Sequence, residues 1–196
     1  MNDPAALAPQ EWSTLCEVRL RGSVLRPAPG HTGELELMGL VVRRGDLVAI
    51  TDAGRAAHAA RARLTPGSPE EAVVREVYQR FGSLNARLLK LCTDWQLRPG
   101  GVPNDHSDPD YDIRILDRLA ATLDCACAEL DRLTAVDGRF AGYAGRLDDA
   151  MRRVDRGEHA WVASVTCDSV HTVWMLFHEE LLCALGVSRA DEQPVV

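Results

Sequence analysis

Four side chains that can bind a ligand or a metal ion share one stretch near the C-terminal end of the chain. Cys167, His171, Trp174 and His178 are separated by four, three and four residues, which places them on one face of a helix. Most neighbouring positions are apolar, so we expect this helix to be buried and its polar side chains to have partners inside a bundle. Three interpretations stay open: a metal site, histidines satisfied by core hydrogen bonds, or a small-molecule pocket with Trp174 as a flat wall.

A metal ion at this face would need help from another segment. Cys167 and His171 are one helical turn apart and can share an ion, whereas His178 lies two turns further along. Candidates for a third ligand are Cys125, Cys127 and His106. The spacing does not identify a metal, and no cofactor is predicted.

The loop at residues 103–112 concentrates four aspartates and a histidine. Its Asp108-x-Asp110-x-Asp112 pattern is similar to a calcium loop, but Ile113 and Leu119 stand where an EF-hand needs glycine and a bidentate glutamate. Acidic residues at a helix start interact favourably with the helix dipole. We therefore interpret these three aspartates as helix-capping residues.

Helix capping does not account for the other polar residues of this loop, Asn104, Asp105 and His106. At one end of a helical bundle they can close over a ligand or form an ion pair with Arg98. With the face described above, the predicted ligand-binding set is His106, Cys167, His171, Trp174 and His178.

No motif of a known catalytic chemistry is present. The sequence lacks Gly-x-Ser-x-Gly, a phosphate-binding glycine loop, His-Glu-x-x-His and a Ser/His/Asp set. The pattern favours a binding protein, and an enzyme that uses His106, His171 and His178 is the least expected alternative.

Helices of the second part of the chain must position these side chains. Apolar residues recur every three or four positions from Val74 to Trp95, which is typical of a helix packed along its length. Two further helices, with apolar positions in 116–130 and 140–154, and a fourth over 161–185 complete a predicted four-helix up-down bundle. Leu64-Thr-Pro-Gly-Ser-Pro69 marks the boundary, giving domains at residues 1–64 and 69–190.

The first domain contains a predicted hairpin followed by a helix. β-Prone runs at Val41–Arg44 and Leu47–Ile50 flank Gly45-Asp46, and Thr51-Asp52 caps a helix over residues 53–63. A helix at 9–24 precedes them. Only about five residues, 34–38, remain for a helix between that first helix and the hairpin.

Residues 38–58 resemble the wing and following helix of MarR-type winged-helix regulators. In that family a helix ends at Gly-Leu-Val, a hairpin follows, and Leu/Ile-Thr-x-x-Gly-Arg opens the next helix. The resemblance implies that Arg43 and Arg44 lie on a wing that contacts DNA, and an exposed arginine pair also suits phosphate contact. A solvated charge pair is the alternative.

The segment expected to precede the wing departs from the MarR pattern. It is too short for a recognition helix, and its Glu34 and Glu36 oppose phosphate. A degenerate winged helix used for protein contacts therefore stays open. The bundle segment contains Thr93-Asp94-Trp95-Gln96, Asn104-Asp105-His106 and His171-Thr-Val-Trp174 with His178-Glu179. With these residues it resembles helical regions that accompany phosphoenolpyruvate-utilising swivelling domains, which implies a partner enzyme of that class.

The charge is unevenly distributed between the two predicted domains. Residues 1–64 carry eight arginines and seven acidic residues, whereas residues 65–196 carry fourteen basic and twenty-two acidic residues, within a total of −7. Any nucleic-acid contact should therefore come from the first part. No apolar run is long enough to span a membrane, and the start has no export signal, so a cytoplasmic protein is expected.

The sequence thus predicts a mainly α protein with a small winged-helix-like module carrying a two-stranded hairpin, followed by a four-helix bundle. The expected function is a MarR-like transcriptional regulator that acts as a homo-oligomer, with DNA and a small-molecule effector as partners. The alternative is a protein-interaction module that does not bind DNA.

Overall fold

The computed structural model describes residues 7–25, 32–189 and 192. The fold is mainly α, as expected, and a small antiparallel sheet precedes the long helices. The chain forms two compact units. The N-terminal unit contains residues 1–64 and 182–188, and the helical unit contains residues 65–181 and 189–196. The end of the last helix thus belongs to the N-terminal unit, an association that the expected domains at 1–64 and 69–190 did not include.

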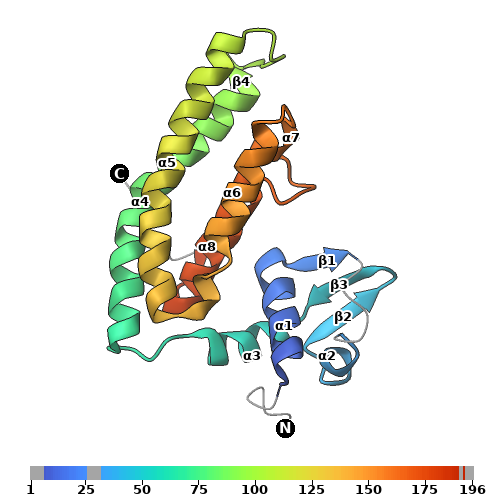
Figure 1. Ribbon diagram of the computed structural model, residues 1–196. Coiled ribbons are helices and arrows are strands. Elements are labelled where there is room, and N and C mark those ends of the chain that lie inside the picture. The colour runs from blue at the N-terminus through green and yellow to red at the C-terminus, as the bar shows by residue number, and fades with distance from the viewer. Residues whose placement is uncertain (1–6, 26–31, 190–191, 193–196) are drawn as a thin grey trace. The chain divides into compact units, whose positions relative to one another are not determined.

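The N-terminal unit alternates helices with short strands (Figure 1). Its sheet has the antiparallel order β1-β3-β2. The elements are α1 (Pro9–Arg21), β1 (Ser23–Leu25), α2 (Gly33–Leu37), β2 (Val41–Arg44), β3 (Leu47–Ile50) and α3 (Asp52–Ala62).

The third strand corrects one expectation from the sequence. The first helix was expected to continue to residue 24, but it ends at Arg21 because Gly22 takes a positive φ of 74° that glycine adopts without strain. Val24 then pairs with Val48. The sheet therefore has three strands in place of the expected two-stranded hairpin.

The hairpin and the helix after it form where the sequence predicts them. Strands β2 and β3 pair in antiparallel register, with Val41 opposite Ile50. The hydroxyl of Thr51 accepts a hydrogen bond from the Gly54 amide and so caps α3. Helix α2 is only five residues long, as expected for the short segment before the hairpin.

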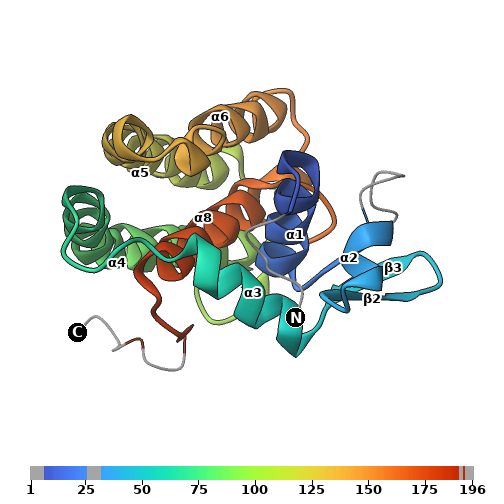
Figure 2. The ribbon, with the colours of Figure 1, turned by 90° about the horizontal axis from the view of Figure 1, so that it is seen from below.

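The four longest helices of the helical unit run alternately up and down, which Figure 1 shows most clearly, and Figure 2 views α4 and α5 almost end-on. They are α4 (Pro69–Gln96), α5 (Pro109–Val136), α6 (Tyr143–Val154) and α8 (Val170–Leu185). The connections contain β4 (Leu97–Arg98), β5 (Val102–Pro103), the 3-10 turn Gly138–Phe140 and the short helix α7 (Ala160–Ala163).

The apolar seam of α4 forms core, as its periodicity predicts. Leu88 is completely buried, and Trp95 is 3% exposed. Ser68 caps this helix at the Glu71 amide, and Asp108 caps α5 at the Tyr111 amide. Within the described residues, no helix combines the length and apolar character needed to cross a lipid bilayer.

The fourth predicted helix, at residues 161–185, is in fact two helices. Helix α7 ends at Ala163, and α8 begins only at Val170. Hydroxyl groups stabilise the break: Ser169 Oγ donates to the Ser164 carbonyl at 2.7 Å and accepts from the Thr172 amide at 3.1 Å, which caps α8. Cys167 therefore lies in the turn before α8 and not on the helical face with His171.

Candidate functional site

Arginines gather along the outer side of α6 and in the turn that follows it. The apolar side chains of α6, such as Leu147 and Val154, are buried, so the polar face of this helix is directed outward. That face and the following turn carry four arginines: Arg146, Arg152, Arg153 and Arg156.

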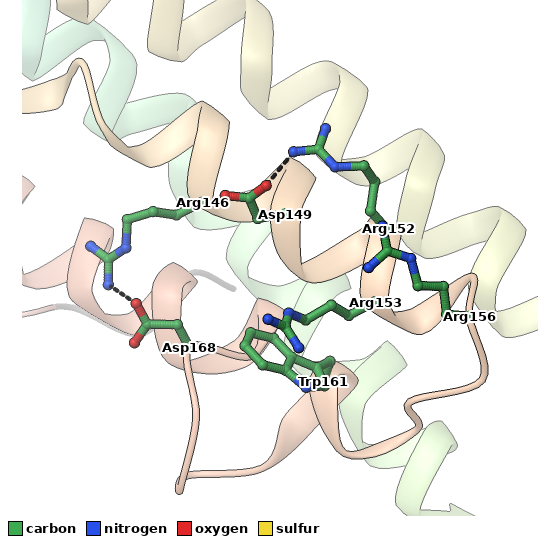
Figure 3. Close-up of a pocket in the computed structure, with 7 residues that line it drawn as sticks. All are labelled: Arg146, Asp149, Arg152, Arg153, Arg156, Trp161 and Asp168. Atoms are coloured by element: carbon green, nitrogen blue, oxygen red, sulfur yellow. Dashed lines mark hydrogen bonds and ion pairs between the residues drawn. The ribbon is translucent and has the colours of Figure 1, made fainter.

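These arginines line a pocket of about 350 Å³ (Figure 3). The remaining lining residues are Asp149 of α6, Trp161 of α7 and Asp168 from the turn before α8. The four guanidinium groups and two carboxylates give the lining a formal charge of +2, although the chain as a whole carries −7. The pocket is therefore locally attractive to anions.

Ion pairs hold two of the arginines at the rim. Arg146 Nη2 lies 3.0 Å from Asp168 Oδ2, and Arg152 bonds to Asp148 and Asp149. The hydrogen bond to Asp149 and the charge of Asp148 raise the pKa of Arg152, so its guanidinium stays charged. The side chains in these pairs are between 32% and 66% exposed. Each pair therefore contributes little to stability.

The other two arginines of the pocket, Arg153 and Arg156, differ in their contacts. Arg153 stacks on the indole of Trp161, with its guanidinium carbon 4.2 Å from the ring centroid, and its Nη1 lies 3.1 Å from Glu158 Oε2. The Arg156 side chain makes neither a hydrogen bond nor an ion pair within the described residues, although its backbone amide donates to the Arg153 carbonyl at 3.1 Å. One guanidinium is thus held in a fixed orientation by stacking, and a second has all its donors available.

This arrangement suits a small molecule with an acidic group. A guanidinium is always charged and presents planar donors that match carboxylate and phosphate oxygens in pairs. Trp161 supplies apolar contact beside those donors. A volume of about 350 Å³ falls within the range of small-molecule sites.

Trp174 and His178, predicted as ligand-binding residues, lie in the core of the helical unit. Trp174 is completely buried, donates from Nε1 to Asn85 Oδ1 at 2.9 Å and stacks on Phe81. His178 is 5% exposed, and its Nε2 lies 2.6 Å from Glu192 Oε1. Burial lowers the pKa of His178 in spite of the nearby Glu192 carboxylate.

His171 and Cys167 do not join these two residues in a shared site. His171 is half-buried, and burial lowers the pKa of its imidazole. Cys167 Sγ is 4.0 Å from the Ala160 carbonyl oxygen. In the described parts of the chain, no three His, Cys, Asp or Glu side chains are placed to share a metal ion.

His106, also a predicted ligand-binding residue, lines a second pocket. Its Nδ1 lies 2.9 Å from Asp112 Oδ2, and Asn104 contacts both side chains. The pocket beside it has a volume of about 340 Å³, and Trp95 and His159 contribute to its walls.

The two predicted DNA-binding arginines differ in their surroundings. Arg43 donates from Nε to Glu36 Oε1 of α2 at 2.9 Å and also bonds to Thr32. Arg44 stands beside the Gly45 turn, exposed and without an ion pair among the described residues. Of the two, Arg44 is therefore the one available to a phosphate group.

The arginine pocket was not predicted from the sequence. The second half of the chain has a net negative charge, and this total hides a short basic segment within it. Arg152-Arg153, Arg156 and the nearby Trp161 lie within ten residues. This local grouping of guanidinium and aromatic residues is a signal that a helix-by-helix charge count would have detected.

No protein-family model matches this sequence, and no curated protein or solved structure was found to be similar to it.

Proposed function

We propose that this protein is a ligand-responsive regulator whose helical unit binds a small anionic molecule. The observation that carries the proposal is the convergence of four arginines and Trp161 on one pocket in an acidic chain. The N-terminal unit would act as the output module. The effector class is a small carboxylate or phosphate compound, because guanidinium groups bind both.

Binding of inorganic phosphate and of citrate, measured separately by titration calorimetry, tests this proposal. Arg153→Gln/Arg156→Gln removes the stacked guanidinium and the one without an ion pair. We expect at least one of the two anions to bind, with about tenfold weaker affinity in the double variant, which corresponds to about 1.4 kcal/mol. The affinity should also fall as salt is raised.

A matched control removes the same charge from another surface. Arg80 forms an exposed ion pair with Glu76 within α4, and Arg132 of α5 forms another with the same carboxylate. Arg80→Gln/Arg132→Gln should leave anion affinity within about twofold, since screened surface charges contribute little at a distance. Equal losses in both double variants, or no binding of either anion, would exclude a specific site at α6.

We propose DNA contact as the first candidate output of the N-terminal unit. The sheet has the strand order β1-β3-β2, and along the chain α1 precedes it and α3 follows it. This arrangement is compatible with the MarR-like resemblance, and Arg44 is available on the hairpin. A gel-shift titration at low salt tests it. We expect weak binding that Arg44→Ala reduces further, because the five-residue α2 bears Glu34 and Glu36. A complete absence of shift would exclude this output.

A protein partner is the second candidate output, and exposed apolar side chains favour it. Leu25 and Leu47 are paired across β1 and β3 on the outer face of the sheet, and both are exposed, as is Val42 of β2. Leu37 of α2 is 82% exposed. Partners would be a second copy of the chain or, as the bundle resemblance implies, a phosphoenolpyruvate-utilising enzyme.

Sedimentation tests self-association through this face. A homodimer that Leu47→Glu dissociates without loss of helix content would support the second output, and a monomer at all concentrations would exclude the homo-oligomer.

We also propose a cytoplasmic location. The support for this proposal is that cysteines such as Cys92 and Cys127 are free thiols.

A further inference from the structure

The pocket beside His106 holds a histidine that is positioned by its neighbours on every side. The imidazole ring contacts the rings of Trp95 and His159, with centroid distances of 4.4 and 4.7 Å, and those two rings also contact each other edge to face at 5.4 Å. All three belong to the helical unit, and all three line the pocket of about 340 Å³. Its lining residues are distinct from those of the arginine pocket.

Asn104 anchors this arrangement with its full hydrogen-bonding capacity. Its Nδ2 donates to the Trp95 carbonyl at 3.1 Å and to Asp112 Oδ1 at 2.8 Å, and its Oδ1 accepts from Arg98 Nε and from the His106 amide. An amide nitrogen has only two hydrogens. Its 3.2 Å approach to His106 Nδ1 is therefore a contact without a shared hydrogen.

The tautomer of His106 follows from its other neighbour. Because a carboxylate only accepts, the 2.9 Å contact between Nδ1 and Asp112 Oδ2 requires that Nδ1 donates. In the neutral ring Nε2 is then an acceptor. Within the described residues Nε2 has no hydrogen-bond partner, so it can accept a hydrogen bond from a donor in the pocket.

The backbone shows that this orientation is imposed on His106. Its φ is 58°, and no other non-glycine residue in the described structure has a positive φ. Such values cost conformational free energy and persist where surrounding contacts enforce them, often at binding sites. Here the Asn104 and Asp112 contacts enforce it.

The charge and shape of the walls define the ligand further. None of the lining residues is Lys or Arg, and Asp112, behind His106, is 8% exposed. The guanidinium of Arg98 stacks on Tyr111, with Nη1 3.7 Å from Asp108 Oδ2. Asp108 is thus the carboxylate nearest to this guanidinium, whose Nη2 is buried without a hydrogen-bond partner among the described residues. Aromatic rings beside a buried carboxylate favour a flat cation.

We propose that this pocket is a second binding site, independent of the anion site, for a planar cation with N–H donors, of the amidine or guanidine type. One N–H donates to His106 Nε2, the flat cationic group stacks against the rings of Trp95 and His159, and the Asp112 carboxylate favours its charge.

Benzamidine is the probe for the test, with ¹⁵N-edited NMR of the histidine side chains as the readout. In the free protein we expect His106 to carry its hydrogen on Nδ1. As benzamidine is added, we expect the His106 Nε2 resonance to shift until the site is saturated. His106→Asn tolerates the positive φ but lacks the ring, and should weaken binding about tenfold. Asp112→Asn should weaken it comparably.

Two comparisons separate this site from the rest of the molecule. His171→Asn, outside the pocket, and Arg153→Gln/Arg156→Gln should both leave benzamidine affinity within about twofold. The proposal is overturned if His106 carries its hydrogen on Nε2, if wild type shows no saturable shift up to about 10 mM benzamidine, or if His106→Asn binds as well as wild type. None of these outcomes bears on the anion titrations of the arginine pocket.

Discussion

Glu180 of α8 carries a carboxyl group into the interior of the helical unit. It is 6% exposed, Tyr143 Oη is 3.3 Å from its Oε2, and Arg139 Nη1 is 3.8 Å from its Oε1. Burial raises the pKa of Glu180, and the Arg139 charge offsets only part of that effect. The carboxylate form is therefore less favourable in the folded protein than in water.

Replacing Glu180 with Gln should stabilise the protein at neutral pH. A group whose pKa is raised by folding contributes stability that is fully present below its unfolded value, near 4.5, and that is lost as pH rises through the folded value. Glu180→Gln removes this dependence. In urea melts from pH 4 to 8, the variant should gain over wild type as pH rises and show little gain near pH 4. A loss at pH 7 would mean that the Arg139 interaction outweighs burial.

At the scale of single residues, the sequence predicted side-chain chemistry better than side-chain surroundings. Periodicity identified Trp174 and His178 as neighbours on a buried face, and both are buried. It did not indicate that Asn85 and Glu192 would take their polar atoms. His106 was singled out because capping left it unexplained, and its pocket depends on Trp95 and His159, which are distant in sequence.

The first turn of α3 packs closely against Leu40 and Ile50 of the hairpin region, and Gly54 makes that close packing possible. A Cβ atom added to Gly54 would lie 2.0 Å from the carbonyl oxygen of Leu40 and 2.9 Å from Ile50 Cγ1. Neither the backbone of Leu40 nor the buried Ile50 can move without displacing the hairpin. The glycine of the Ile-Thr-x-x-Gly-Arg segment thus has a packing role.

Gly54→Ala should therefore destabilise the N-terminal unit by about 1–3 kcal/mol, as expected for overpacking. Circular dichroism during thermal unfolding measures the effect. Gly145→Ala is the control: Gly145 is also helical, but a Cβ there meets nothing within 4 Å. That variant should be neutral or more stable by up to about 1 kcal/mol. A Gly54→Ala protein as stable as wild type would show that α3 can shift away from Leu40.

The seam of α4 gives a second prediction at this scale. Leu88 is completely buried in the helical unit, so Leu88→Ala should reduce the free energy of unfolding by about 2–5 kcal/mol. Arg87→Ala, an exposed neighbour on the same helix, should change it by less than about 0.5 kcal/mol. Urea melts measure both. A loss below about 1 kcal/mol for Leu88→Ala would contradict the packing described for α4.

Long, strongly periodic helices were predicted well, and short breaks were not. The seam and caps of α4 follow from sequence because they are local. The break between α7 and α8 depends on the Ser169 hydroxyl, which donates to the Ser164 carbonyl and accepts from the Thr172 amide in place of helical hydrogen bonds. Apolar content alone favoured one continuous helix there. Strand β1 was missed because its pairing with β3 is a long-range contact.

At the scale of the whole molecule, one compact unit combines two segments that are far apart in the sequence. The last turns of α8 and the residues after it, 182–188, belong to the N-terminal unit. The Leu64 amide donates to the Ala184 carbonyl at 2.9 Å, and a Cβ on Gly186 would lie 2.7 Å from the Arg63 side chain. No local pattern in residues 1–64 indicates this, since the stabilising segment lies over a hundred residues away.

Removing that segment should loosen the end of the N-terminal unit. Leu182, Ala184 and Leu185 are buried, so a chain ending at Leu181 loses their apolar contacts and leaves the Leu64 amide without its acceptor. Hydrogen exchange followed by mass spectrometry should then show faster exchange over α3 through Leu64. A chain ending at Arg189 retains the whole segment and should match the full-length protein there. Equal protection in both shortened chains would mean that residues 1–64 hold α3 by themselves, and that the C-terminal segment is not an integral part of this unit.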